Sequence, residues 1–291
     1  MSLWAARIGV WLVGRMSGWP QRWRTALAWL LADIAWLLFR PRRHITLANL
    51  RACFPQMTEA ERWSIGRASF RNLLRSVFDH AVLWHADQAV VERYVKVEGR
   101  EHLLAADNRP LIVIAPHFVG LDAGGAGISL LVRCVSVYAR QKNPVWDESL
   151  LRGRQRFNDP VLLARQGVDM RRVIRYVKDG LVLYYLPDMD LGRLNSIFVP
   201  FFGVPAATIP MVPRIARMTG ARVIMGVTEM TVDGYTLHLE APWEDFPGAS
   251  LEQDTVRMNR EIERWVLRLP AQYLWSHRRF KTRPEGEPGF Y

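Results

Sequence analysis

Cysteine is almost absent from this chain of 291 residues, which contains only Cys53 and Cys134. Two cysteines so far apart in the sequence offer no disulfide framework and no cysteine-based zinc site, which fits a reducing compartment. Hydrophobic residues make up 49% of the chain and charged residues 23%, which excludes a wholly disordered protein. A chain of this length can bury most of its apolar surface without covalent cross-links.

Acidic residues are also few, because 28 Asp and Glu stand against 39 Lys and Arg and give a net charge of +11. A basic protein favours anionic partners, and nucleic acid, anionic lipid and an acidic protein all meet that condition. The excess is concentrated at the start of the chain. Residues 1–43 contain seven arginines, a single acid (Asp33) and six of the twelve tryptophans.

The sequence has no hydrophobic run long enough to make a confident membrane span. The longest, from Ala26 to Phe39, has fourteen residues and contains Asp33. As a helix it measures roughly 21 Å, against the ~30 Å of a bilayer's hydrocarbon core. Tryptophan and arginine together favour the membrane–water boundary. We therefore predict that residues 1–43 form an interfacial or partly inserted anchor. The alternative is a Trp-rich core helix packed on the rest of the protein.

Residues 44–291 are expected to form one α/β domain. A capping box at Thr58–Glu61 predicts a helix that runs to about Trp84. Beyond it, β-rich runs alternate with helical stretches, which predicts a mostly parallel central sheet flanked by helices. The predicted strands are 94–98, 111–115, 135–138, 181–186, 223–227 and 235–239. The predicted helices are 122–133, 164–179, 208–219 and 251–268.

Several common catalytic motifs are missing. The chain has no GxxxxGK[ST] phosphate loop, no GxSxG nucleophile elbow and no HExxH metal motif. Among the seven histidines only His80 and His85 are near neighbours, and their spacing of five does not place both on one helix face. We therefore expect neither a metal ion nor a bound cofactor.

One segment does carry the residues of a catalytic site. The apolar run Leu111–Ala115 leads into Pro116 and His117, and Asp122 then opens a helix. Open α/β folds bind their ligands at the carboxyl ends of their strands. Asp122 can turn back to hold one imidazole nitrogen, which leaves the other free to take a proton from a hydroxyl. No serine or cysteine nucleophile stands nearby, so the pattern predicts direct transfer to a substrate hydroxyl. In the structural alternative, Asp122 only caps the helix and His117 is an ordinary loop histidine.

The His-x4-Asp arrangement after an apolar strand resembles the signature of the glycerolipid acyltransferases. Motifs along the rest of the chain resemble one branch of them, the late acyltransferases of lipid A biosynthesis, which are the lauroyl and myristoyl transferases of Gram-negative bacteria. Members carry either glutamate or aspartate at the position of Asp122. The motifs, in chain order, are Arg140 to Pro144, Gly153 to Phe157, Pro187 to Asp190, Phe198 to Gly203 with Ala206 to Thr208, and Gln272 to Pro284.

This resemblance implies a role for five residues. His117 is expected to be the general base on the acceptor hydroxyl, with Asp122 orienting it and stabilising the imidazolium. Arg154, Asp188 and Arg140 match positions expected to bind substrate, since an arginine fork suits a phosphate or a developing oxyanion. Two plain structural alternatives stay open, in which Arg154 is a solvated helix charge and Asp188 is a loop cap.

Two further motifs have more than one interpretation. The aromatic residues Phe198, Phe201 and Phe202 either line an acyl groove or belong to the core. The segment His277–Arg283 has the composition of a nucleic-acid patch. In this context we interpret it as a C-terminal structural element near anionic headgroups.

The predicted function is therefore acyl transfer at the cytoplasmic face of the bacterial inner membrane, from an acyl carrier protein thioester to a hydroxyl of a lipid A precursor. The basic charge suits an acidic carrier protein, a phosphorylated acceptor and anionic membrane lipid, and no nucleic acid is expected. One alternative is an acyltransferase of the same fold that acts on another glycolipid or phospholipid. Another is a non-enzymatic protein that binds the membrane surface, for which His117 and Asp122 have no use.

Overall fold

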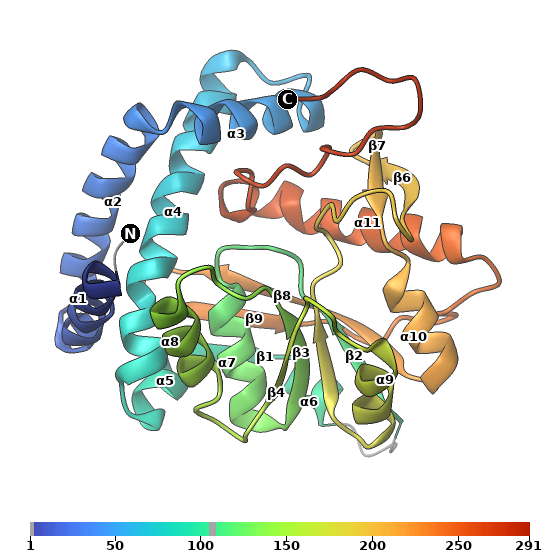
Figure 1. Cartoon of the computed structure of the whole chain (residues 1–291), viewed down its shortest axis with the longest axis horizontal. Coiled ribbons are helices and arrows are strands. Elements are labelled where there is room, and N and C mark those ends of the chain that lie inside the picture. Colours follow the sequence, from blue (N-terminus) through green and yellow to red (C-terminus); the bar gives the residue numbers. More distant parts are fainter. Residues whose placement is uncertain (1–2, 105–108) are drawn as a thin grey trace.

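The computed structural model describes residues 3–104 and 109–291, and within them a seven-stranded sheet forms the centre of the molecule (Figure 1). The strand order is β1-β9-β8-β2-β5-β3-β4, and neighbouring strands are parallel except for the antiparallel pair β8 and β9. Strands β6 and β7 form a separate hairpin. The bounds are β1 (Val95–Glu98), β2 (Leu111–Ile114), β3 (Cys134–Tyr138), β4 (Val161–Ala164), β5 (Val182–Tyr185), β6 (Ile197–Phe201), β7 (Val204–Thr208), β8 (Arg222–Met230) and β9 (Tyr235–Leu239).

Helices cover both faces of the sheet, as the central strand β2 shows. Its residues Leu111 and Val113 pack in one cluster with Ile128 of α7, while Ile112 and Ile114 face a second cluster that contains α9, α10 and α11. All four strand residues are buried, which explains why this strand is a continuous apolar run. The helices are α1 (Leu3–Arg15), α2 (Gln21–Leu38), α3 (Arg40–Cys53), α4 (Glu59–His85), α5 (Gln88–Tyr94), α6 (Arg100–Leu103), α7 (Leu121–Leu131), α8 (Pro144–Arg154), α9 (Met170–Lys178), α10 (Met211–Thr219) and α11 (Leu251–Arg268).

The predicted α/β class with a mostly parallel sheet is thus confirmed, and each predicted strand is present. The helix predicted over 164–179 is wrong at its start, because β4 ends at Ala164 and α9 begins only at Met170. Between them Gly167 adopts a positive φ of 76°, and the Asp169 side chain accepts a hydrogen bond from the Arg171 N–H at the helix start. The sequence pattern also missed strand β4, the β6–β7 hairpin and α8, although Asn143 and Pro144 are typical start signals for a helix.

The long helix α4 begins where the sequence predicts. The Thr58 N–H donates to the Glu61 carboxylate at 2.7 Å, and the Glu61 N–H donates to the Thr58 hydroxyl at 3.3 Å, so both halves of the capping box are formed. The helix contains 27 residues and is therefore about 40 Å long. It connects the N-terminal helices to the edge of the sheet domain (Figure 1).

Helix α2 packs along α4 through aromatic and charged side chains. The ring of Trp36 is buried, with its centroid 5.1 Å from that of Trp63 and 4.9 Å from that of Phe70. Asp33, the acid inside the apolar run, pairs with Arg67 and Arg71 of α4. Asp33 therefore stabilises the packing of α2 against α4.

A buried charge cluster joins α2, α4 and β9. The Asp79 carboxylate has no exposed surface, accepts from the Tyr235 hydroxyl at 2.9 Å and lies 3.3 Å from Arg75 and 3.7 Å from Arg24. Removing one partner from such a buried cluster costs about 3–5 kcal/mol, because the remaining charges stay buried and unpaired. The N-terminal helices are thereby fixed to the sheet domain. The predicted domain boundary between residues 43 and 44 lies inside α3.

The outward face of α1 and α2 is apolar. None of the helices in the described ranges combines the length and apolarity that crossing a bilayer requires. Of the six tryptophans in this region only Trp36 is buried, so the alternative of a Trp-rich core helix holds for Trp36 and not for the other five. The most exposed large apolar side chains here are Trp4 (74%), Trp11 (63%), Trp23 (61%), Leu30 (60%), Leu37 (63%), Leu38 (71%) and Phe39 (60%).

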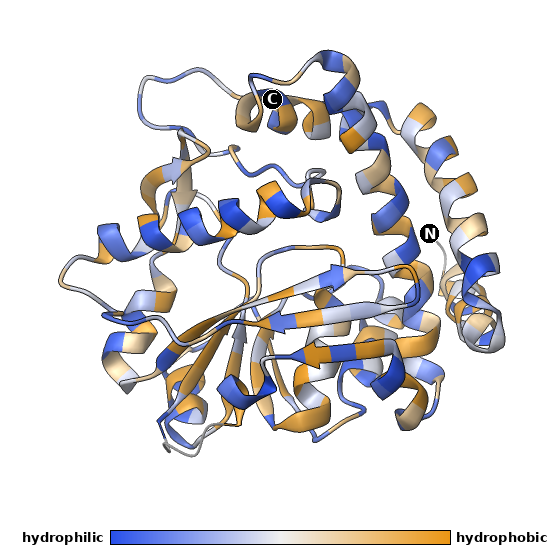
Figure 2. Cartoon of the chain, turned by 180° about the vertical axis from the view of Figure 1, so that it is seen from behind, coloured by the Kyte–Doolittle hydropathy of each residue, from blue (hydrophilic) through white to orange (hydrophobic). Residues whose placement is uncertain are grey.

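The C-terminal helix and tail close the upper part of the molecule. Hydrophilic and hydrophobic bands alternate along α11, and its apolar side packs into the core (Figure 2). The chain then returns to α3, where the Asn49 amide donates to the carbonyls of Trp275 and His277 at 2.8 and 2.7 Å. Arg279 is buried and donates to the Ala207 carbonyl at 2.9 Å. These contacts support the interpretation of the tail as a structural element.

Candidate active site

His117 and Asp188 meet at the carboxyl ends of two neighbouring strands. Strands β2 and β5 are parallel with Ile114 opposite Tyr185, and each of the two functional residues follows its strand by three positions. The ring Nδ1 of His117 lies 2.7 Å from Asp188 Oδ1, and the His117 backbone N–H donates to Oδ2 at 2.9 Å. The sequence predicted both residues as part of the site but did not predict that they pair.

Asp188 is an ionised carboxylate held by three donors, the third being the Tyr273 hydroxyl at 3.0 Å. Burial raises the pKa of this carboxyl, but the charge and hydrogen bonds of His117 outweigh it, so the pKa lies well below its ordinary value. An ionised carboxylate can only accept, so His117 carries its proton on Nδ1. When the ring is neutral, the opposite nitrogen, Nε2, is therefore the acceptor that a general base needs.

The C-terminal tail holds the His117 loop from the other side. The Leu274 N–H donates to the His117 carbonyl at 2.9 Å, and Phe118 forms a β-bridge with Tyr273. The Val119 N–H donates to the Gln272 carbonyl at 2.9 Å. The distinctive motif from Gln272 onward therefore fixes the backbone on which the imidazole stands.

Asp122 pairs with other residues, not with His117 as the sequence predicted. Its Oδ1 accepts from Arg154 Nε at 2.6 Å and its Oδ2 lies 3.1 Å from His80 Nε2, so both oxygens are engaged. The physical reason is that α7 starts at Leu121 and points this first-turn side chain toward α4 and α8. The alternative of a simple helix cap is also wrong, since Gly120 occupies the cap position and makes no side-chain cap bond.

The cluster of Asp122, Arg154 and His80 is partly shielded from water. Burial raises the pKa of Asp122, but the charge of Arg154 and the hydrogen bond from His80 lower it well below its ordinary value. The His80 ring stacks on Trp84 with centroids 4.1 Å apart. A side chain at Gly153 would place its Cβ 2.3 Å from the Trp84 ring, so glycine there allows α8 to bring Arg154 to Asp122. Arg154 is therefore not a solvated helix charge.

His80 was not identified by the sequence analysis as a site residue. A histidine and a tryptophan four positions apart lie on one face of a helix, but that spacing is equally common in helices with no functional site. Arg140, predicted as a substrate-binding residue, is exposed on the loop after β3. Its neighbours Ala139 and Gln141 line the cavity described next, while Arg140 does not.

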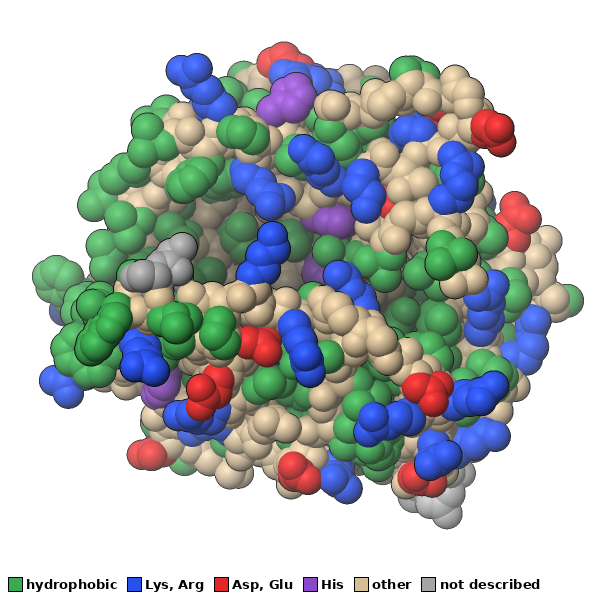
Figure 3. All heavy atoms as spheres, in the orientation of Figure 1, with side chains coloured by type: hydrophobic (Ala, Val, Ile, Leu, Met, Phe, Trp, Pro, Cys, Tyr) green, Lys and Arg blue, Asp and Glu red, His purple; other side chains and the backbone are tan. Residues whose placement is uncertain are grey.

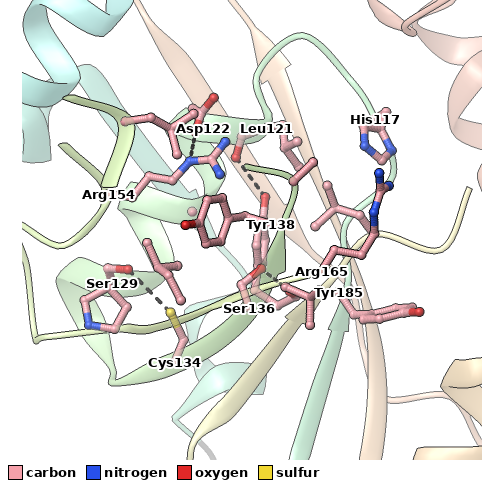
Figure 4. Close-up of a pocket in the computed structure, with 18 of the residues that line it drawn as sticks. His117, Leu121, Asp122, Ser129, Cys134, Ser136, Tyr138, Arg154, Arg165 and Tyr185 are labelled. Atoms are coloured by element: carbon pink, nitrogen blue, oxygen red, sulfur yellow. Dashed lines mark hydrogen bonds and ion pairs between the residues drawn. The ribbon is translucent and has the colours of Figure 1, made fainter. Parts of the chain in front are cut away.

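His117, Asp122 and Arg154 all line one cavity of about 480 Å³. This volume is within the range of roughly 300–1,000 Å³ usual for small-molecule sites. Figure 4 shows His117 at one side of it, and Ser129 and Cys134 at the opposite end. The lining is mostly apolar and includes Leu83, Trp84, Leu121, Ala126, Val137, Tyr138, Leu150, Phe157, Leu162, Tyr184, Leu186 and Met189. On the face shown in Figure 3, Lys and Arg side chains gather round a hollow with histidine at its centre.

The aromatic motif is not part of this lining. Phe201 is fully buried in the core, and Phe202 packs against it with ring centroids 5.1 Å apart. Phe198 lies under the Arg193 guanidinium at 5.5 Å. The core interpretation is therefore correct for Phe201 and Phe202, whereas Phe198 is half-buried outside the core. Within residues 3–104 and 109–291, no group of three or more His, Cys, Asp or Glu side chains is placed to hold a metal ion.

Comparison with known proteins gives consistent similarities along the chain. Residues 1–282 match the family model described as bacterial lipid A biosynthesis acyltransferase. The lipid A biosynthesis lauroyltransferase of Escherichia coli is 32% identical over 99% of this chain and 95% of that protein. The lipid A biosynthesis palmitoleoyltransferase of the same organism is 33% identical over 86% of this chain and 82% of its own length. Its lipid A biosynthesis myristoyltransferase is 29% identical over 98% and 89%, respectively.

We predict that the free energy of unfolding decreases as the pH is lowered from about 6.5 to about 4. The responsible group is His277, whose Nε2 accepts from the Asp190 N–H at 3.3 Å. Burial, above all, lowers the pKa of this imidazole to about 4. In the unfolded chain the pKa is about 6.5, so in this window the unfolded state binds the additional proton and the free energy of unfolding decreases. Urea unfolding at pH 7 and pH 4.5 should show a loss of about 2 kcal/mol from this group, since one pKa unit corresponds to about 1.4 kcal/mol.

The matched control is His277→Gln, which keeps an acceptor for the Asp190 N–H but does not titrate in this range. Its stability should decrease less than that of the wild type over the same two pH values. Equal losses in both proteins would show that other groups cause the pH dependence.

Proposed function

Since the chain belongs to the bacterial lipid A biosynthesis acyltransferases, we propose that it transfers a fatty acyl chain from acyl carrier protein to a hydroxyl of a lipid A precursor. The acyltransferase activity in lipid A biosynthesis follows from the family; the donor, the acceptor group and the mechanism are the proposal. The observation that carries it is the His117–Asp188 pair at the edge of an apolar cavity. A hydroxyl at His117 Nε2 can be deprotonated there while an acyl chain lies in the cavity.

In this mechanism His117 is the general base. Its Nε2 takes the proton of the acceptor hydroxyl as the oxygen attacks the thioester carbonyl. Asp188 keeps the ring in the required tautomer and stabilises the imidazolium that forms. The Asp122–Arg154 pair lies in the same cavity, where Asp122 fixes the guanidinium of Arg154 beside the bound acyl thioester.

The donor and acceptor both suit the charge of the protein. A net charge of +11 attracts an acidic carrier protein and a phosphorylated glycolipid through long-range steering. The basic side chains round the hollow in Figure 3 support the same proposal. Related enzymes are named for lauroyl, palmitoleoyl and myristoyl transfer, so the family handles acyl chains of different length.

The direct test is acyl transfer by the purified protein from acyl carrier protein to a phosphorylated lipid A precursor, followed by mass spectrometry. His117→Ala should lower kcat by roughly 10²–10⁴-fold, the usual contribution of a positioned general base. Asp188→Asn should have an effect of similar size. Its amide N–H can donate to Nδ1, which moves the ring proton to Nε2 and removes the acceptor.

The control for these variants is Asp233→Asn, a change on an exposed turn far from the site in sequence. It should leave kcat within about twofold, as expected for a surface substitution. A folded His117→Ala protein with near-normal turnover would exclude the general-base mechanism. If Asp188→Asn behaved like the Asp233 control, the carboxylate would have no role in setting the tautomer.

We also expect the cavity to limit the length of the acyl chain. Ser129 and Cys134, whose Oγ and Sγ lie 3.5 Å apart, are both buried at the end of the cavity away from His117. Cys134→Phe should shorten this end, so that kcat/KM for the longest accepted donor falls at least about tenfold relative to a shorter one. The measurement is a competition among acyl carrier proteins that carry chains of increasing length.

Cys134→Ser is the control, because it keeps the volume nearly unchanged and should retain the wild-type preference. Cys134→Leu provides a smaller increase in volume if the phenylalanine variant fails to fold. An unchanged preference in a folded Phe or Leu variant would place the end of the acyl chain elsewhere.

We also infer that the protein associates with the cytoplasmic face of the bacterial inner membrane through α1 and α2. The exposed tryptophans and leucines of these helices form an apolar face, and the arginines of residues 1–43 suit anionic headgroups. An interfacial helix buries such a face in the boundary between headgroups and acyl chains.

The corresponding test replaces Trp4, Trp11 and Trp23 together by serine and measures flotation with anionic vesicles. A large buried apolar side chain contributes about 1.5–3 kcal/mol, so the triple variant should bind more than tenfold more weakly. The control replaces three exposed apolar residues outside α1 and α2 by serine in the same way, namely Leu194, Val232 and Leu267. If both triple variants float equally well, the membrane-binding surface does not include α1 and α2.

A further inference from the structure

Arg165 occupies a position that neither the motifs nor the proposed mechanism explains. It follows β4 directly, and its backbone N–H donates to the Tyr138 carbonyl at 2.8 Å, which extends the pairing of β3 with β4. Its Cα is therefore fixed by the sheet at the same carboxyl edge that carries His117 and Asp188. The carboxyl edge of a parallel sheet is where this class of fold assembles ligand sites.

The Arg165 side chain lines the cavity together with His117. Figure 4 shows it extending from the sheet edge toward the His117 ring. The described cavity lining contains two arginines, and they differ in their surroundings. Arg154 is bound to Asp122, whereas the described residues give Arg165 no carboxylate partner. Of these two arginines, Arg165 is therefore the one whose charge remains available to an anion.

We propose that Arg165 stabilises the negative charge that develops on the thioester carbonyl oxygen during acyl transfer, an inference that rests on the proposed function. In the first step, the acceptor oxygen bonds to the carbonyl carbon and its proton moves to His117 Nε2. The π electrons of the carbonyl move onto the carbonyl oxygen. In the second step, that electron pair re-forms the carbonyl, the C–S bond breaks with its electrons on sulfur, and the imidazolium returns the proton to the sulfur.

Geometry favours the carbonyl oxygen over a substrate phosphate as the group that Arg165 contacts. The attacking hydroxyl must lie at His117 Nε2, and the carbonyl oxygen is only one C=O bond of about 1.23 Å from the carbon under attack. A guanidinium directed at the imidazole is therefore directed at the place where charge appears. Donors that are already in place where charge develops lower the barrier most. Arg154, neutralised by Asp122, is less suited to this task than to binding in the ground state.

The test compares Arg165→Met with Arg165→Lys in steady-state transfer from acyl carrier protein to the lipid A precursor. Arg165→Met should lower kcat by about 10²–10³-fold, the usual loss when an oxyanion donor is removed. The KM for each substrate should change less than about threefold, since the oxyanion exists only in the transition state. Arg165→Lys keeps the charge and should recover part of kcat. Arg172→Gln, which removes an exposed arginine of α9, is the control and should match the wild type.

Two results would overturn the proposal. If Arg165→Met raised the KM for the acceptor and left kcat unchanged, the guanidinium would bind a ground-state phosphate. An acceptor lacking one phosphate would then be insensitive to the substitution. If folded Arg165→Met showed wild-type kcat and KM, Arg165 would have no part in the reaction. Failure of the proposed function is a separate outcome, because in that case the wild type itself would transfer no acyl chain.

Discussion

The candidate site depends on one buried carboxylate, that of Asp188. It is only 1% exposed and accepts three hydrogen bonds, from the backbone and ring of His117 and from the hydroxyl of Tyr273. These donors belong to the loop after β2 and to the C-terminal tail, while Asp188 itself follows β5. An ionised group at this depth is stable only with such partners, because its burial without them costs several kcal/mol. The same contacts that compensate the charge hold three distant parts of the sequence together at the candidate site.

A second carboxylate, Asp122, organises the other side of the cavity in a different way. Asp188 holds a base, whereas Asp122 holds a cation, Arg154, and engages His80 with its remaining oxygen. The two carboxylates therefore do not compete for one imidazole. Arg154 is neutralised by Asp122 within the cavity, and on our proposal Arg165 provides the positive charge for the reacting carbonyl. The separation of these tasks follows from which strand or helix carries each residue.

The sequence predicted six of the seven strands of the sheet and named residues of the candidate site, but it missed β4 and the pairings within the site. Apolar runs of the right length predicted the strands, and the capping box predicted the start of α4, since both signals are local. The spacing of His117 and Asp122 suggested a hydrogen bond between them, yet spacing does not show in which direction the first turn of α7 points. Strand order and helix packing bring Asp188, His80 and Arg165 to different parts of the candidate site. A single residue carries no periodic pattern from which such long-range contacts can be predicted.

Helix α4 joins the N-terminal helices to the cavity of the sheet domain. Along its first half Arg67 and Arg71 bind Asp33 of α2, and near its end His80 binds Asp122. Between them Asp79 binds Arg24 in the protein interior. On the proposed function, α1 and α2 lie at the membrane surface where the lipid acceptor is found. A rigid helix about 40 Å long, bound to α2 along its middle and to Asp122 near its end, then helps to set the distance between that surface and His117. On the proposed function, the contacts of α4 therefore also influence where along a bound lipid the reacting hydroxyl lies.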